Sequence, residues 1–370
     1  MNGFVIDKDK LIKNVQEVLK RAGKRKLYAV VKGDGYGFGL KEYVNILLSC
    51  GVNAFAVTEP NEAEIIRQYG AGDIEILMLR STSVESELES LIKNRAVITI
   101  GSSRSAAAAN SVAAKLGITP YPVHIKIDTG MGRYGFSPKE SDDIISVYKY
   151  MENLKAEGIY THLNCAFGSK KKTRAQVDTF LRVCEDISKA GYDTGCVHYA
   201  NSSALFRFVD WDFKDAVRIG SALTGRLAVP VKNSGLAKVG YLESRVCEIK
   251  WLSPGATVGY GGVYKARNAV RVAIIPLGYS HGLGVEKIRD SYRIRDGIRY
   301  ILQDLKRTLT GQKIHVKVNG KPARVLGHIG MLHTVIDVTR IDCEVGDRVT
   351  ADVSPLYVDG NVKRKFISHE

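Results

Sequence analysis

A lysine at the end of a short apolar run is the residue around which a reaction could be built in this chain. Residues 27–31 are apolar and β-prone, and Lys32 follows them directly, at the start of the glycine-rich stretch 33–39. In parallel α/β architectures the C-terminal ends of the strands carry the chemistry. A partly desolvated amine there loses its proton and can attack an aldehyde, so Lys32 is a candidate for Schiff-base formation. A salt-bridged surface lysine beside a flexible loop fits the same spacing.

Polar side chains recur at the ends of the other apolar runs. They are Tyr36 after the first run, Lys126, Asp128 and Arg133 at the fifth, His162 at the sixth, His198, Asn201 and Ser202 at the seventh, and Arg218 in the eighth. In a barrel these ends share one rim. A rim of lysine, arginine, histidine, hydroxyl groups and glycine amides suits an anionic ligand with an aldehyde, which describes pyridoxal phosphate. Singly, His162 could be a core histidine, Arg218 a structural ion-pair partner and Asn201-Ser202 a helix cap.

The elements that must position these residues alternate regularly. Apolar runs predict eight strands at 27–31, 52–57, 74–79, 96–100, 122–127, 158–163, 196–200 and 216–219. Helical periodicity marks 9–21, 62–69, 84–93, 103–116, 141–151 and 175–190. This alternation predicts an α/β fold class, a (β/α)8 barrel rather than a doubly wound sheet. The barrel is assigned to residues 1–230, with packing of the extreme N-terminus on the second domain as an alternative.

A second domain is predicted from residue 231 to residue 370. Its stretches alternate apolar and polar residues, are rich in β-branched side chains and are closely punctuated by Gly and Pro, which is typical of antiparallel strands. A basic segment at 285–313 interrupts this pattern. Its apolar residues have helical spacing and predict a helical insertion, namely Ile294, Ile298, Ile301, Leu302, Leu305 and Leu309.

Composition excludes several classes of protein. The formal net charge is +15, yet the basic residues are dispersed apart from the run 170–174, and no nucleic-acid motif accompanies them. The six cysteines have no CxxC spacing, so neither a zinc site nor a disulfide framework is predicted. Neither a signal-type segment nor a membrane-length apolar run is present. We therefore expect a cytoplasmic protein with a solvated basic surface, no metal, and no nucleic-acid or membrane partner.

Several motifs in a fixed order carry a resemblance to a known family. They are Ala29-Val30-Val31-Lys32 with Tyr36-Gly37, Lys126-Ile127-Asp128-Thr129-Gly130-Met131-Gly132-Arg133, Tyr160-Thr161-His162, Ala200-Asn201-Ser202, Arg218-Ile219-Gly220, Val258-Gly259-Tyr260-Gly261, Pro276-Leu277-Gly278-Tyr279 and Asp337-Val338-Thr339. On these residues the chain resembles the alanine racemases, pyridoxal-phosphate enzymes built from a barrel and a β domain. The resemblance covers nearly the whole chain and implies racemisation of alanine by a homodimer with shared active sites.

The resemblance also implies roles for single residues. Lys32 would carry the cofactor as a Schiff base and act as the base on one face of the substrate, while Tyr260 of the partner subunit would act on the other face. Two such groups are needed because a proton removed from one face of a planar carbanion must return to the other. Arg218 would hydrogen-bond the pyridine nitrogen with support from His162, and cofactor phosphate would meet Tyr36, Ser202, Gly220 and Ser221.

The substrate side of the site is assigned in the same way. Arg133 would orient the catalytic tyrosine and help to hold the substrate carboxylate, the backbone of Met331 would meet that carboxylate, and Tyr279 would line the entrance. Lys126 matches a lysine that is carbamylated in some members of the family. No metal is implied.

The sequence departs from the family pattern at several positions, so it predicts the mechanism more firmly than the identity of the substrate. Gly33-Asp34-Gly35, His281, Leu332 and the 285–313 insertion differ from the usual residues. The usual C-terminal phosphate-binding tyrosine lacks a matching motif, and Tyr357 is a candidate for it. Alanine is the expected substrate, with serine, a basic amino acid or a broad set as alternatives. The alternative functions are a related decarboxylase using Cys165 or another cysteine as an acid, a non-catalytic pyridoxal-phosphate carrier and a nucleic-acid binder.

Overall fold

The computed structural model describes residues 2–69, 73–287, 289, 293–310 and 314–369, and it divides into two compact units. Lys8–Val239 form one unit, and Met1–Asp7 with Gly240–Glu370 form the other. The predicted insertion at 285–313 falls partly outside the described residues, at 288, 290–292 and 311–313. Each unit is described by itself below.

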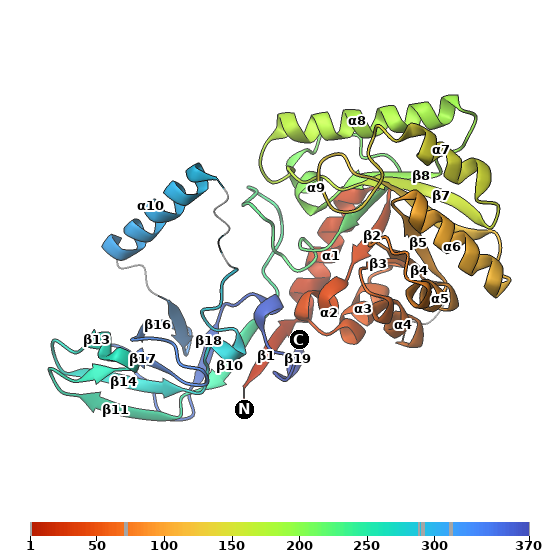
Figure 1. Cartoon of the computed structure of the whole chain (residues 1–370). Helices are drawn as coiled ribbons and strands as arrows, with labels where there is room; N and C mark the ends of the chain where they lie inside the picture. The colour runs from red at the N-terminus through yellow and green to blue at the C-terminus, as the bar shows by residue number, and fades with distance from the viewer. Residues whose placement is uncertain (1, 70–72, 288, 290–292, 311–313, 370) are drawn as a thin grey trace. The chain divides into compact units, whose positions relative to one another are not determined.

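The first unit is a closed barrel of eight parallel strands (Figure 1). The strands are β2 (Lys26–Val30), β3 (Ala54–Val57), β4 (Glu75–Met78), β5 (Ala96–Ile100), β6 (Tyr121–Ile127), β7 (Leu154–Thr161), β8 (Cys196–Ala200) and β9 (Ala216–Ile219). Each pairs with the next in sequence, and β9 pairs with β2 to close the barrel. The predicted (β/α)8 barrel is therefore confirmed, including its eighth strand at 216–219.

Helices surround these strands. They are α1 (Lys8–Ala22), α2 (Lys32–Gly37), α3 (Leu40–Ser49), α4 (Pro60–Tyr69), α5 (Glu85–Lys93), α6 (Ser103–Leu116), α7 (Ser141–Tyr150), α8 (Lys170–Lys189) and α9 (Ser202–Arg207). Local signals explain their ends: in α6, Ser102 and Ser105 form a capping box, and Gly117 ends the helix in the left-handed conformation that glycine adopts most easily.

The barrel unit ends at Val239, nine residues beyond the position expected from the sequence. The reason is a buried asparagine in α1. Asn14 accepts a hydrogen bond from the Ala237 N–H at 2.9 Å and donates to the Ala237 carbonyl at 2.8 Å. The Val239 N–H donates to Thr224 O at 3.2 Å. These contacts hold residues 231–239 on the barrel, although they form no helix or strand.

The second unit is built on a nine-stranded, mostly antiparallel sheet. In spatial order its strands are β11 (Glu248–Leu252), β14 (Val270–Ile275), β17 (Thr334–Asp337), β16 (Lys321–Leu326), β15 (His315–Val318), β18 (Arg348–Ala351), β10 (Tyr241–Arg245), β1 (Gly3–Asp7) and β19 (Arg364–Ile367). Strand β1 joins it by pairing antiparallel to β10 and parallel to β19. The second domain predicted as mostly antiparallel is confirmed.

Smaller elements complete this unit. A two-stranded ribbon, β12 (Thr257–Val258) with β13 (Tyr264–Lys265), flanks the short 3-10 turn Tyr260–Gly262, and a second such turn spans Tyr279–His281. The described part of the insertion contains one helix, α10 (Ile294–Thr310). Among the described helices, none has both the length and the apolar character that crossing a bilayer requires.

Candidate active site

A cavity of about 470 Å³ lies at the C-terminal ends of the barrel strands. It is lined by Val30, Lys32, Tyr36, Thr58, Glu59, Leu79, Arg80, Lys126, Arg133, Tyr134, Tyr160, His162, Asn201, Ser202, Ser203, Arg218, Gly220 and Ser221. The structure thus brings together nine of the predicted site residues, from Lys32 at the first strand to Ser221 after the eighth. The cavity lies in the size range of small-ligand sites, which is about 300–1,000 Å³.

The glycine-rich stretch after Lys32 forms a left-handed helical turn. Residues 33–36 all have positive φ, between 53° and 64°. Glycines at 33 and 35 adopt this conformation readily, whereas Asp34 and Tyr36 carry a side-chain penalty of about 1–2 kcal/mol each. Asp34 Oδ1 accepts a hydrogen bond from the Leu40 N–H at 2.8 Å, which fixes the turn against the start of α3. The turn directs Tyr36 into the cavity that Lys32 also lines.

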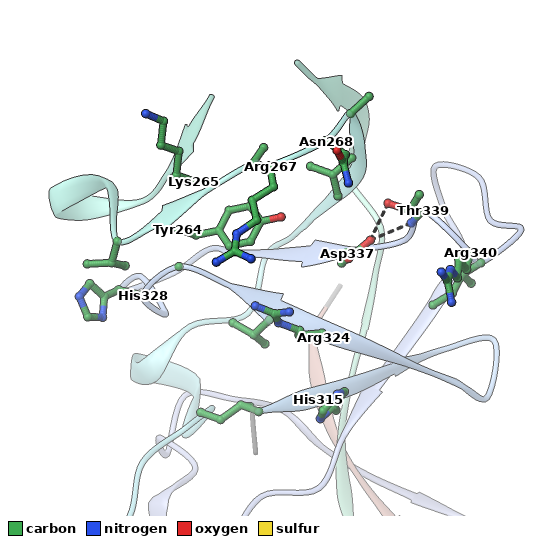
Figure 2. Close-up of a pocket in the computed structure, with 18 of the residues that line it drawn as sticks. Tyr264, Lys265, Arg267, Asn268, His315, Arg324, His328, Asp337, Thr339 and Arg340 are labelled. Atoms are coloured by element: carbon green, nitrogen blue, oxygen red, sulfur yellow. Dashed lines mark hydrogen bonds between the residues drawn. The ribbon is translucent and has the colours of Figure 1, made fainter. Parts of the chain in front are cut away.

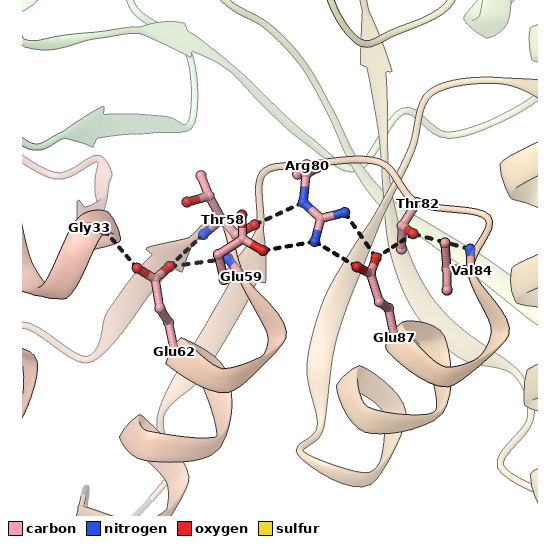
Figure 3. A network of polar contacts seen from close by, with 8 residues as sticks. All are labelled: Gly33, Thr58, Glu59, Glu62, Arg80, Thr82, Val84 and Glu87. Atoms are coloured by element: carbon pink, nitrogen blue, oxygen red, sulfur yellow. Dashed lines mark hydrogen bonds and ion pairs between the residues drawn. The ribbon is translucent and has the colours of Figure 1, made fainter.

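A buried carboxylate anchors the first residue of this turn. Glu62, near the start of α4, accepts hydrogen bonds from the N–H groups of Gly33 at 2.6 Å, Thr58 at 2.9 Å and Glu59 at 3.1 Å. Figure 3 shows how Arg80 extends the network, donating to Thr58 O, Glu59 and Glu87. The backbone beside Lys32 is therefore tied to the ends of β3 and β4. Sequence reasoning missed Glu62, because a glutamate in the first turn of a helix usually faces solvent.

Two lysine amines at the cavity are shifted toward their neutral forms. Burial lowers the pKa of Lys32, with a further contribution from the Arg133 cation, while Glu62 opposes the shift. Burial lowers the pKa of Lys126 to about 7, and the nearby Arg218 and Arg133 cations act in the same direction. Both shifts increase the fraction of neutral, nucleophilic amine at ordinary pH.

Arg133 is positioned by a loop that closes around one carboxylate. Asp128, just after β6, accepts hydrogen bonds from the N–H groups of Gly130 at 2.9 Å, Met131 at 2.6 Å and Arg133 at 3.0 Å. Burial raises the pKa of Asp128, but these donors outweigh it and the net shift is downward. The loop therefore stays closed with Asp128 ionised, and the Arg133 side chain lines the cavity.

Arg218 is buried and is held by three acceptors. Its Nη1 donates to His198 Nδ1 at 2.8 Å and to His198 O at 3.1 Å, and its Nη2 donates to Thr161 O at 2.6 Å. Burial lowers the pKa of Arg218 to about 10, so the guanidinium stays protonated at neutral pH. The residue expected to support Arg218 was His162, whereas His198 is the histidine that hydrogen-bonds Arg218 among the described contacts.

Arg218 determines which atoms donate and which accept in the hydrogen bonds from Arg218 to His198 and from His198 to His124. A guanidinium only donates, so His198 Nδ1 must accept and its proton lies on Nε2. That Nε2 is 3.0 Å from His124 Nδ1, which accepts in turn. Burial lowers the pKa of His198 well below its usual value and that of His124 to about 4. Both imidazoles are therefore neutral near pH 7, each with its proton on Nε2.

The two histidines occupy irregular points in their strands. The register shifts between Val123 and His124 in the pairing of β6 with β7, and between His198 and Ala200 in the pairing of β8 with β9. Such bulges redirect side chains near active sites. His198 also lies between the rings of Tyr28 and Tyr160, with centroids 5.3 and 4.9 Å away. Sequence reasoning missed His124, although its two-residue spacing from Lys126 places both on one face of the strand.

The remaining histidine of the rim, His162, lines the cavity directly. Burial lowers its pKa to about 3, and the Arg218, Lys126, Lys32 and Arg133 cations add to the shift. A neutral ring at this position leaves the positive charge of the cavity to its lysines and arginines.

An anion cradle is formed after the last two barrel strands. Ser202 Oγ accepts hydrogen bonds from the N–H groups of Gly220 at 3.2 Å and Ala222 at 3.3 Å. A Cβ atom at Gly220 would come within 2.3 Å of Tyr36 Oη. The Gly220 N–H, the Ser202 hydroxyl and the Tyr36 phenol thus lie close together, and a side chain at residue 220 would not fit between them. Barrels frequently bind phosphate in the loops after their seventh and eighth strands.

The donor set of the cavity fits pyridoxal phosphate. Lys32 would offer an amine to the aldehyde, the Gly220 cradle would offer the Ser202 and Tyr36 hydroxyl groups to the phosphate, and Arg218 would offer a fixed donor to the ring nitrogen. The cationic side chains complement the anionic cofactor.

The other three predicted site residues lie in the β unit. Tyr260 begins the turn between β12 and β13 and is 82% exposed. Tyr279 and Met331 lie in neighbouring loops: Tyr279 N donates to Gly330 O at 3.0 Å, and Ser280 Oγ donates to Met331 O at 2.7 Å. Gly278 is required there, because a Cβ atom would come within 2.2 Å of Met331 O.

The β unit also has a hollow of its own, of about 1540 Å³ (Figure 2). Basic side chains line it, namely Lys265, Arg267, Arg324 and Arg340. Of the predicted site residues, all of which the structure describes, none lines this hollow. It is therefore separate from the predicted site residues, although Asp337 and Thr339 of the Asp337-Val338-Thr339 motif line it.

Comparisons with known proteins agree across both units. A model of the alanine racemase N-terminal domain matches residues 6–228, and one of the C-terminal domain matches 239–354. An alanine racemase of Clostridium tetani is 33% identical over 350 residues, 93% of this chain and 84% of that protein. The solved alanine racemase of Clostridium difficile 630 superposes with a TM-score of 0.86 at 26% identity, covering 100% of this chain and 96% of that one.

A further solved structure shares the fold. It is the alanine racemase from Bartonella henselae with covalently bound pyridoxal phosphate, with a TM-score of 0.82 at 23% identity and 99% coverage of both chains.

Replacing His124 should destabilise the barrel by leaving a buried donor unpaired. We expect His124→Leu to lower the free energy of unfolding by about 1–3 kcal/mol, because His198 Nε2–H loses its acceptor. His124→Gln should lose less, since its amide oxygen can accept. Urea denaturation of both variants measures the difference, and equal losses would contradict the directed chain of hydrogen bonds.

Replacing Gly220 should disrupt the anion cradle. The added methyl group in Gly220→Ala would clash with the Tyr36 phenol, so we expect affinity for pyridoxal phosphate to fall at least about tenfold, as measured by absorbance titration. Gly168→Ala is the matched control, because its Cβ would meet only Cys165 O at an ordinary 3.7 Å. An unchanged affinity in Gly220→Ala would refute the cradle.

Proposed function

The chain belongs to the alanine racemase family, as its motifs predict, and we propose that it interconverts L- and D-alanine by a two-base mechanism, with Lys32 and Tyr260 of the partner subunit as the bases. It is a pyridoxal-phosphate-dependent isomerase of that family. The observation that carries the proposal is the placement of Lys32, with its lowered pKa, in one cavity with the fixed donor Arg218 and the Gly220 cradle.

Pyridoxal phosphate, when bound, supplies the conjugated ring that makes the α-proton of an amino acid acidic. Lys32 would hold the cofactor and then take or return a proton on one face of the α-carbon. Its amine is suited to this work because burial and Arg133 favour the neutral, proton-accepting form.

Arg218 would bind the ring nitrogen without protonating it. Its guanidinium keeps its proton at neutral pH and is fixed by Thr161 O and His198. A donor that does not release its proton limits how strongly the ring withdraws electrons, which leaves more of the task to the two bases.

Arg133 would hold the substrate carboxylate, together with the backbone of Met331, and orient the catalytic tyrosine. The loop closed around Asp128 places its guanidinium at the cavity before any ligand binds. Such preorganisation reduces the entropy that substrate positioning costs. Tyr279 would line the entrance to this site.

A homodimer would bring the second base to the barrel. Tyr260 belongs to the β unit, its side chain is 82% exposed, and the turn that presents it is fixed by the β12–β13 ribbon. An exposed phenol on a structured turn is suited to entering a neighbouring subunit. The free state of all six cysteines accords with action in the reducing cytoplasm.

Lys126 would be carbamylated. Its pKa of about 7 makes a neutral amine available, and the carbamate would place a negative charge beside Arg133 and Arg218. In this reaction the amine nitrogen bonds to the carbon of CO2 and one proton leaves to solvent. Carbamate formation requires the neutral amine.

The racemisation proposal is tested by incubating holoenzyme with each alanine enantiomer in D2O. We expect deuterium at Cα together with inversion. Tyr260→Phe should slow inversion by about 10²–10⁴-fold, because the second acid-base group is lost, while Lys32 still exchanges the proton on its own face. Tyr264→Phe, a change in the same ribbon, should retain activity.

Three outcomes would contradict this reaction. Full inversion in Tyr260→Phe would remove the two-base assignment, and inversion confined to serine or basic amino acids would change the substrate. No exchange with any amino acid, despite bound cofactor, would favour the non-catalytic carrier.

Carbamylation of Lys126 should increase with pH. Below about pH 7 the amine is protonated and cannot add CO2, whereas above it the neutral form predominates, so we expect carbamate to rise between pH 6 and pH 8. ¹³C NMR of enzyme equilibrated with ¹³C-bicarbonate measures it, and Lys126→Met is the control that should abolish the signal. A signal that persists in that variant, or none at pH 8, would refute the assignment.

A further inference from the structure

Helix α10 presents an apolar stripe that its own unit leaves uncovered. Its six isoleucine and leucine side chains are between 53% and 85% exposed. They are Ile294, Ile298, Ile301, Leu302, Leu305 and Leu309. At 3.6 residues per turn, they fall within an arc of about 100° on one side of the helix. A stripe of this kind stabilises a helix only when something packs on it.

Positive charge adjoins the stripe. Arg295, Arg299 and Lys306 follow one edge of the apolar arc, as the same helical geometry requires. Both acidic residues of the helix lie beside arginines. Asp304 accepts from Arg289 Nη1 at 2.7 Å, and Asp296 lies 3.5 Å from Arg299 Nη2, which offsets part of the positive charge of the edge. The chain as a whole carries a formal charge of +15.

We propose that α10 lies in the plane of an anionic lipid surface, with its isoleucine and leucine stripe among the acyl chains and its basic edge among the headgroups. Basic amphipathic helices of this length bind membranes in this way. Long arginine and lysine side chains can extend from the edge of such a helix to the headgroup charges. The association is peripheral and independent of the racemase reaction. It is not a bilayer crossing, and it departs from the expectation, drawn from the sequence, that the protein has no membrane partner.

A second copy of α10 is a poorer occupant of the stripe. In an antiparallel pair related by a two-fold axis, the same edges of the two helices meet, so Arg295, Arg299 and Lys306 would face their own copies. In a parallel pair the basic edge would face Asp304, which Arg289 already neutralises. Nucleic acid is also a poorer fit, because its phosphates would leave the isoleucine and leucine side chains exposed.

The proposal is tested by sedimenting the full-length holoenzyme with lipid vesicles. We expect binding to phosphatidylglycerol–phosphatidylcholine vesicles at a ratio of about 1:1, little binding to pure phosphatidylcholine, and several-fold weaker binding at high salt. Binding to neither kind of vesicle, or equal binding to both, would overturn the proposal.

Two neighbouring substitutions separate the stripe from charge alone. Leu302→Asp and Gln303→Asp add the same negative charge, but residue 303 lies on the opposite side of the helix. We expect Leu302→Asp to weaken vesicle binding about tenfold or more and Gln303→Asp to weaken it far less. Similar losses in both would overturn the stripe as the lipid-binding face.

Two further measurements exclude other causes. Racemase activity in solution should be unchanged in both variants, which shows that they fold. Light scattering should give native protein and Leu302→Asp the same mass. A smaller mass for Leu302→Asp would mean that a second copy covers the stripe, and it would overturn the lipid assignment.

Discussion

The buried guanidinium of Arg218 is the constraint on which the barrel interior depends. A permanently charged group that can only donate requires acceptors on every side, and the barrel supplies Thr161 O, His198 O and His198 Nδ1. That requirement fixes the tautomer of His198 and, through it, that of His124. It also explains why two barrel strands are irregular at these histidines, since a regular register would aim the rings elsewhere. Both strand irregularities thus position histidines that belong to the hydrogen-bond chain of the Arg218 guanidinium.

A second constraint acts at the start of the same site. The left-handed turn after Lys32 is costly for Asp34 and Tyr36, and it is maintained by hydrogen bonds from outside the turn. Glu62 is buried because the Gly33, Thr58 and Glu59 N–H groups satisfy its charge. The strained backbone directs the Tyr36 side chain toward Gly220, where its phenol forms one wall of the cradle. Backbone strain after the first barrel strand therefore helps to form the predicted anion site after the eighth.

The sequence predicted what depends on periodicity and motif, and it missed what depends on three-dimensional neighbours. Apolar runs located all eight barrel strands, and Lys32, Arg218 and Ser202 reached one rim because parallel strands place them there. His124 and Glu62 went unassigned, since His198 lies 74 residues from His124 and Gly33, the link from Glu62 to the Lys32 turn, lies 29 residues from Glu62. The boundary at Val239 was placed early because Asn14 holds an irregular segment that has no pattern to recognise. The sequence predicted a glycine-rich stretch after Lys32, but it did not predict that the stretch forms a left-handed turn.

Charge also limits which amino acids the site can favour. Lys32, Lys126, Arg133 and Arg218 surround one cavity, whereas the nearby carboxylates of Glu59 and Glu62 are engaged by Arg80 and by backbone donors. Such a cavity would be stabilised by each anion that it bound, including the cofactor phosphate, the substrate carboxylate and the carbamate proposed on Lys126. A basic side chain on the substrate would add a cation to a cluster whose members already depress the pKa values of Lys32 and Lys126. The electrostatics of the barrel therefore favour a neutral amino acid over a basic one, independently of the family to which the chain belongs.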